Sequence, residues 1–163
     1  SVPIVIRRVD PQDFEDVWSV LKPSFRAGDT YTIDPNVSQS DALDYWVFSG
    51  KTAFLAGVSG VPLGTYYIRP NQGGNGNHVC NCGFVTAPQA RGQGVARAML
   101  QHALETACEI GYFAMQFNFV VKTNTRAIDI WKRAGFEVVG QLPKAFRHPH
   151  KGNTDALIMY KIL

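Results

Sequence analysis

The stretch FVTAPQARGQGVARAML, from Phe84 to Leu100, decides the fold. A β-rich run ends at Pro88, and a glycine-rich turn then opens directly into an amphipathic helical pattern. The N–H groups at the start of a helix have no partner inside it, and the helix dipole adds about half a positive charge there. This strand–turn–helix unit therefore predicts an anion-binding site that suits a diphosphate.

The two glycines of this turn have two interpretations. Gly92 and Gly94 allow the backbone to come close to a ligand. Alternatively, glycines before a helix form a tight connection between a strand and a helix and bind no ligand. The turn alone does not decide between ligand binding and a simple connection.

Residue patterns on both sides of this unit predict alternating strands and helices. Three β-rich runs at 52–58, 64–69 and 78–85 are separated by short turn segments, which is typical of an antiparallel meander. Further strands are predicted at 4–8, 113–121, 136–139 and 156–162, and helices after Asp10 and at 40–48, 94–110 and 125–134. We therefore expect an α/β fold with a mixed, largely antiparallel central sheet flanked by helices, in a single domain over 1–163.

Composition limits the classes of function. Hydrophobic residues make up 45% of the chain and charged residues 18%, which is the balance of a globular protein. No apolar run is long enough to span a membrane, and the first residues lack the apolar core of a signal peptide. A net charge of +3 is too small to indicate nucleic-acid binding. We expect a cytoplasmic protein that binds neither membrane nor nucleic acid, and the oligomeric state stays open, a homodimer included.

Two motifs carry a resemblance to a known family. Arg91, Gly94 and Ala96 form RxxGxA and, with the strand before them, resemble the acetyl-CoA signature of the GNAT superfamily of N-acetyltransferases. The segment TNTRAIDIWKRAGF, residues 123–136, is similar to the penultimate helix of that family. Two separated motifs in the right order are hard to obtain by chance. The resemblance implies an enzyme that moves an acetyl group from acetyl-CoA to a primary amine.

The resemblance also implies which residues hold acetyl-CoA. The diphosphate would bind the turn and first helical residues, namely Arg91, Gly92, Gln93, Gly94, Val95, Ala96 and Arg97. The backbone of Phe84, Val85 and Thr86 would pair with the pantetheine arm like an extra strand. Asn124 would contact the cofactor or order its turn, and a helix N-cap explains it equally well.

The catalytic residues of the family are not all present. Many members have a tyrosine in the penultimate helix that protonates the departing thiolate, whereas this chain has Trp131, which we expect to be a pocket wall or a core residue. Several members have a carboxylate base early in the signature strand, at a place that falls on His78. A histidine can act as a base near neutral pH, but a lone histidine at a strand start is also often a solvated polar residue.

Three other polar groups need an explanation. Asn118 interrupts the apolar run AMQFNFVV, and it either satisfies a break in the strand or points into the cleft to orient an amine. Tyr31 and Asp29 lie in the segment that usually covers the acceptor in this superfamily, so we assign them to acceptor binding. The basic segment 143–152 is either a solvated loop or a contact for an acidic acceptor or the CoA phosphate.

A zinc site and a nucleotide site are weaker alternatives. His78, Cys80 and Cys82 form HxCxC. Alternate residues of a strand surround one metal ion less well than a CxxC turn does, so we expect no metal. Neither of the common phosphate-loop patterns of nucleotide-binding proteins occurs. We predict an acetyl-CoA-dependent N-acetyltransferase with a small-molecule or α-amine acceptor. A catalytically idle CoA-binding module and a protein lysine or N-terminal acetyltransferase remain as alternatives.

Overall fold

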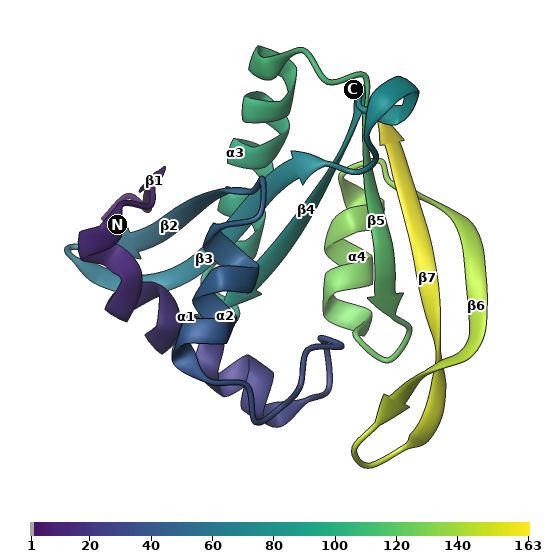
Figure 1. The fold of residues 1–163 in the computed structure, drawn as a ribbon, viewed down its shortest axis with the longest axis horizontal. Coiled ribbons are helices and arrows are strands. Elements are labelled where there is room, and N and C mark those ends of the chain that lie inside the picture. Colours follow the sequence, from purple (N-terminus) through teal and green to yellow (C-terminus); the bar gives the residue numbers. More distant parts are fainter. Residues whose placement is uncertain (1) are drawn as a thin grey trace.

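A seven-stranded mixed sheet forms the centre of the computed structural model, which describes residues 2–163 (Figure 1). The strands are β1 (Val5–Arg8), β2 (Thr52–Val58), β3 (Val61–Pro70), β4 (Val79–Thr86), β5 (Ala114–Val121), β6 (Glu137–His148) and β7 (Gly152–Ile162). The α-helices are α1 (Phe14–Ala27), α2 (Gln39–Val47), α3 (Val95–Ile110) and α4 (Thr125–Arg133). The strand order is β1-β2-β3-β4-β5-β7-β6, and within residues 2–163 only β4 and β5 pair in parallel, so the predicted fold class is confirmed.

The helices begin and end where local signals in the sequence place them. The Asp10 side chain accepts a hydrogen bond from the Gln12 N–H at 2.9 Å and starts the short 3₁₀ turn that leads into α1. Ser38 caps α2 in the same way. Gly111 ends α3 in the left-handed conformation, with φ of 101°. Among residues 2–163, no helix is long and apolar enough to cross a membrane.

The two faces of the sheet carry different helices. Thr65 and Tyr67 of β3 contact α2, because the Trp46 indole donates to the Thr65 hydroxyl at 3.0 Å and its ring lies 4.8 Å from that of Tyr67. The intervening Tyr66 points the opposite way and bonds His102 of α3 at 2.6 Å. Helices α1 and α2 therefore cover one face, and α3 and α4 cover the other.

The sheet opens between β4 and β5. The two strands pair only through 79–81 of β4 and 114–116 of β5, although they continue to Thr86 and Val121. Figure 1 shows the two strands diverging beyond this short ladder. The edge of β4 that faces β5 is consequently free of sheet partners from Cys82 onward.

The C-terminal hairpin is longer than the sequence predicted. We expected a strand only at 136–139, and for the basic segment 143–152 either a solvated loop or a contact for an acidic acceptor or the CoA phosphate. The loop expectation was wrong, because most of that segment belongs to β6. Two irregularities in the β6–β7 register hide the strand pattern. At the second, Lys144 has a positive φ of 52° and its N–H donates to Asp155 at 2.8 Å. In Figure 1 the tip of this hairpin projects away from the helices.

Candidate active site

A cleft of about 310 Å³ occupies the gap between β4 and β5. Its walls come from both faces of the sheet, since residues of the α1–α2 segment, β3, β4, β5 and α4 all line it. A second hollow of about 260 Å³ lies at the start of α3 and shares Thr86, Arg91, Ala96, Arg126 and Ile130 with the first. The two form one path from the start of α3 to the middle of the sheet.

The start of α3 presents free backbone donors to this path. The Ala98 N–H donates to the Gly94 carbonyl at 3.0 Å, so the N–H groups of residues 95–97 precede the first bond of this kind. Gly92 and Gly94 have φ of 79° and 82°, and a Cβ added to either would meet no atom within 4 Å. The left-handed backbone suits glycine, and the open space beside it suits an anion such as a diphosphate.

The structure brings most of the predicted cofactor residues together. The second hollow is lined by Arg91, Gly92, Gly94, Val95, Ala96 and Arg97. Gln93 does not line either hollow in the described chain; its side chain donates to the Gln89 carbonyl at 3.0 Å instead. Arg126, near the start of α4, lines both hollows and was missed. The sequence signal for Arg126 was a basic residue two positions after Asn124, which was itself predicted to contact the cofactor.

The free edge of β4 lies along the cleft. The Ala87 N–H donates to Leu63 of β3 at 2.8 Å, and strand alternation then directs the backbone groups of Phe84 and Thr86 toward the gap. Val85 lines the cleft too, but the same alternation turns its backbone groups toward β3. Two of the three predicted strand residues therefore have the backbone orientation that an added extended chain requires.

Tyr31, in the segment between α1 and α2, contacts the free edge of β4. Its hydroxyl donates to the Phe84 carbonyl at 3.0 Å, and its ring packs 5.5 Å from Phe25 and 5.7 Å from Trp46. Burial raises the pKa of Tyr31 well above its usual value, so the hydroxyl stays protonated. Tyr31 lines the cleft, whereas Asp29 is half-buried and is not among the lining residues of the described chain.

Asn124 and Trp131 of α4 form another wall of the cleft. Asn124 is the N-cap of α4 and accepts from the Ala127 N–H at 3.4 Å, and it also lines the cleft. Trp131 is 7% exposed, with its ring 5.1 Å from Phe84 and 4.9 Å from Phe117. The expectation that Trp131 is a pocket wall or a core residue is confirmed.

The two predicted catalytic residues lie in different places. Asn118 lines the cleft next to a break in the β5–β7 register, so both of its interpretations are compatible with the structure. Its amide accepts from Gln116 at 2.9 Å and donates to Asn71 at 2.7 Å. His78 is exposed in the turn before β4, with its ring 5.9 Å from Phe113, and it is not among the described residues that line the cleft.

The placement of His78 also bears on the zinc alternative. Cys80 and Cys82 are buried in β4, but His78 precedes the strand and does not share their environment as HxCxC suggested. Burial raises the pKa of the Cys82 thiol, which disfavours the thiolate that a metal requires. In residues 2–163, no three His, Cys, Asp or Glu residues gather closely enough to hold a metal ion.

Sequence reasoning missed the polar residues at the closed end of the cleft. Arg69, Asn81 and Gln116 lie side by side on β3, β4 and β5 in the last row before the strands separate. Asn81 is 5% exposed, and its amide donates to the Gln116 carbonyl at 2.9 Å. The sequence signal for Asn81 was an amide residue between Cys80 and Cys82 in a β-rich run.

Aromatic rings enclose this end of the cleft. The Tyr67 ring covers Gly83, where a Cβ would come within 2.5 Å of it, so glycine is required there. Tyr45 of α2 lies edge-on to Tyr67 with ring centroids 6.4 Å apart, and both line the cleft. Burial raises the pKa of Tyr67, which keeps its hydroxyl a neutral donor.

Comparison with known proteins identifies the family. The profile described as "Acetyltransferase (GNAT) family" matches residues 14–136. The chain is 33% identical to N-acetyltransferase aca1 of Schizosaccharomyces pombe, over 80% of this chain and 71% of the relative. The structure of a GCN5-related N-acetyltransferase from Kribbella flavida superposes with a TM-score of 0.93 and 34% identity, over 98% of both chains.

A more distant structure has the same fold. A GNAT superfamily phosphinothricin acetyltransferase from Sinorhizobium meliloti, solved in complex with AcCoA, superposes with a TM-score of 0.86 at 17% identity, over 98% of this chain and 88% of that one. The matched profile spans the glycine-containing turn before α3, the open strand pair and α4. The chain therefore belongs to the GNAT family of N-acetyltransferases, and its co-substrate is acetyl-CoA.

Proposed function

We propose that this enzyme acetylates the α-amine, or a similarly weakly basic amine, of a small molecule. The observation that carries the proposal is the lining of the cleft, which contains no Asp, Glu, His or Lys among the described residues. A lysine side chain with a pKa near 10.4 costs about 4 to 5 kcal/mol to present as a neutral amine at pH 7, whereas a peptide α-amine near 7.7 to 8.0 costs about 1 kcal/mol. A cleft without a base suits the second kind of amine.

Enclosure of the cleft supports a small acceptor. Tyr31 crosses from the α1–α2 segment to the Phe84 carbonyl, and Tyr45 packs edge-on to Tyr67 at the closed end. The whole cleft has a volume of about 310 Å³ and must also hold part of the pantetheine arm, so little room is left at the closed end for an acceptor.

The proposed binding mode assigns the two ends of the path to two substrates. The N–H groups of residues 95–97 and the side chains of Arg91 and Arg126 bind the diphosphate at the start of α3. The N–H of Phe84 and the backbone groups of Thr86, which have no partner in the sheet, hold the pantetheine arm. This arrangement leaves the closed end, beside Arg69 and Asn81, for the acceptor.

The proposed reaction is direct attack within this geometry. The neutral amine attacks the thioester carbonyl, a C–N bond forms, the C–S bond breaks, and the amine releases one proton as the CoA thiol is formed. Catalysis rests on positioning and on backbone N–H groups of β4 that polarise the carbonyl. In this proposal Asn118, which lines the cleft, orients the amine. Since a thiol pKa lies near 8.5, the thiolate can leave without a dedicated acid.

A substrate screen tests this proposal. Purified protein and acetyl-CoA are incubated with free amino acids, small α-amines, N-terminal peptides, polyamines and Nα-acetyl-lysine amide while free thiol is measured. We expect turnover with small α-amines and at least tenfold less with Nα-acetyl-lysine amide. Preference for the lysine side chain, or for N-terminal peptides over every small molecule, would refute the proposal.

A further inference from the structure

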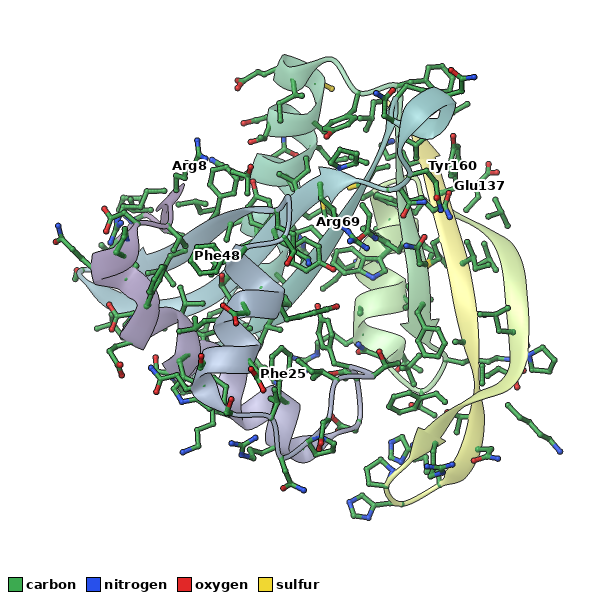
Figure 2. All side chains as sticks on the ribbon, viewed as in Figure 1. Arg8, Phe25, Phe48, Arg69, Glu137 and Tyr160 are labelled. Carbon is green, nitrogen blue, oxygen red and sulfur yellow. The ribbon has the colours of Figure 1, made fainter. Side chains whose placement is uncertain are left out.

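Arg69 has an unpaired nitrogen at the closed end of the cleft. Its Nε is the one buried side-chain nitrogen or oxygen in residues 2–163 that has no hydrogen-bond partner. Arg69 lines the cleft and neighbours Asn81 across the β3–β4 ladder. Figure 2 shows it near the middle of the molecule rather than at its margin. A buried donor without a partner is costly in a folded protein, so a donor of this kind on the wall of a cleft is a candidate for binding a ligand.

A second cation lies close to Arg69. The Lys51 ammonium is 4.6 Å from the ring centre of Tyr45 and 5.3 Å from that of Tyr67, and both rings line the cleft. Burial and then the positive charge of Arg69 lower the pKa of Lys51. Within the described chain, neither cation has a carboxylate partner, and no carboxylate lines the cleft. The wall of the closed end therefore carries the positive charge of Arg69, the Lys51 ammonium lies over the Tyr45 and Tyr67 rings, and no paired carboxylate within residues 2–163 compensates either charge.

This charge is separate from the phosphate end of the path. Asn81, beside Arg69, precedes Thr86 by five residues of β4, which corresponds to roughly 16 Å along an extended strand. Arg69 also follows Tyr67 by two positions in β3, so its side chain leaves the sheet on the α1–α2 face. Arg91 and Arg126 serve the start of α3, and Arg69 remains for the acceptor.

We infer that Arg69 binds a carboxylate on the acceptor, and that the acceptor is accordingly an α-amino acid or a close analogue with an oxyanion beside its amine. A guanidinium matches a carboxylate with two parallel hydrogen bonds, and its Nε is one of the donors of such a pair. This inference rests on the proposed function and names its substrate class. Polyamines and other cationic amines are excluded by the same charges.

The two cations also favour the reactive form of the amine. A nearby positive charge disfavours an ammonium ion, so an amine bound near Arg69 and Lys51 loses its proton more easily than in water. The carboxylate of a free amino acid normally has the opposite effect on its amine, and pairing with Arg69 cancels it. Recognition of the carboxylate and activation of the amine without a protein base thus follow from one arrangement.

The test compares neutral L-amino acids with their carboxamides as acceptors. For each pair, kcat/KM is measured with the wild type, Arg69→Gln, Arg69→Lys and the matched control Arg8→Gln, an exposed arginine on β1 at the far edge of the sheet. We expect Arg69→Gln to lower the ratio of acid to carboxamide on the order of ten- to a hundredfold, with a smaller loss in Arg69→Lys. Arg8→Gln should keep the wild-type ratio. Comparing ratios between variants cancels the different basicities of the two amines.

A binding measurement separates failure of this inference from failure of the proposed function. Calorimetry on the wild type with CoA present compares N-acetyl-L-amino acids with their carboxamides, and we expect at least tenfold tighter binding of the acids. Equal binding, or an unchanged ratio in Arg69→Gln, would overturn the assignment of Arg69 even if amines are acetylated. Tighter binding of the acids would support it even if Arg69→Gln does not fold.

Discussion

Trp131 lines the cleft but cannot protonate the departing thiolate, which is the role that the resemblance gives to a tyrosine at this position. Its indole packs against Phe84 and Phe117 and lines the cleft, with 7% of its surface exposed. An indole N–H is a hydrogen-bond donor that does not give up its proton near neutral pH. The side chain can therefore shape the cleft but cannot serve as the acid.

Replacement of Trp131 by phenylalanine should change turnover little. Phe keeps an aromatic wall against Phe84 and Phe117, so we expect kcat within about tenfold of the wild type, whereas loss of a real general acid removes about 10² to 10⁴. Steady-state kinetics with saturating acetyl-CoA measure the effect. A loss beyond a hundredfold with intact cofactor affinity would mean that the indole takes part in the chemistry.

Residue roles that follow from local rules could be predicted from the sequence. Asp10 and Asn124 act as caps, as helix-start patterns indicate, and Trp131 packs as an apolar residue of its helix. Arg69 could not be predicted, because its unpaired nitrogen arises from three strands that meet only in the folded sheet. His78 was expected on a strand, but β4 begins one residue later and leaves it exposed in a turn.

At the scale of elements, the start of α3 is the proposed binding site of the CoA diphosphate. The helix begins at Val95 after Gly94, and its first N–H groups face the hollow shared with Arg91 and Arg126. A side chain at Gly94 would project into open space beside these donors, because a Cβ there meets no protein atom within 4 Å. The space is available to a ligand and would be lost to a side chain.

The substitution Gly94→Asp should abolish CoA binding while the protein stays folded. The new carboxylate would accept hydrogen bonds from the same N–H groups and would repel the diphosphate. We expect at least a hundredfold loss of CoA affinity by calorimetry. The control is Gly60→Asp, since Gly60 has φ of 79° and equally open surroundings but lies in the β2–β3 turn. Unchanged CoA affinity in Gly94→Asp would disprove this site assignment.

The accuracy of predicted elements followed the regularity of their patterns. The predicted range of β2 matches the structure, and α3 and α4 differ from theirs by one residue at one end. By contrast, β6 was recognised only in its first residues, because Gly140, Pro143 and the bulge at Lys144 interrupt the alternation on which strand prediction depends. The bulge is held by Asp155 of the neighbouring strand, a contact that no local pattern reveals.

At the scale of the whole molecule, the open strand pair separates the two proposed binding sites along one path. The free donors of α3 lie at the end of β4, and the row of Arg69, Asn81 and Gln116 lies where β4 and β5 still pair. Tyr45 of α2 and Tyr31 of the α1–α2 segment enclose the end of the cleft beside Arg69. The resemblance to the family implied that the backbone of residues 84–86 pairs with the cofactor, but the charge at the closed end of the cleft could be found only in the structure.

The pH dependence of activity tests the whole arrangement. Because no Asp, Glu or His of the described chain lines the cleft, we expect the acceptor itself to set the pH at which activity appears. For an amino acid carboxamide, whose amine resembles a peptide α-amine, kcat/KM should rise about tenfold per pH unit and level off near 7.7 to 8.0. For a more basic acceptor the same curve should shift to higher pH by the difference between the two amine pKa values, because kcat/KM is proportional to the fraction of free amine that is neutral.

A base on the protein would instead give both acceptors a common inflection, since it would titrate in the enzyme and not in the substrate. Rate profiles for the two acceptors, each measured at saturating acetyl-CoA, decide between these outcomes. A common inflection that disappears in His78→Ala would show that the exposed histidine reaches the reaction after all and would contradict the assignment of proton release to the acceptor.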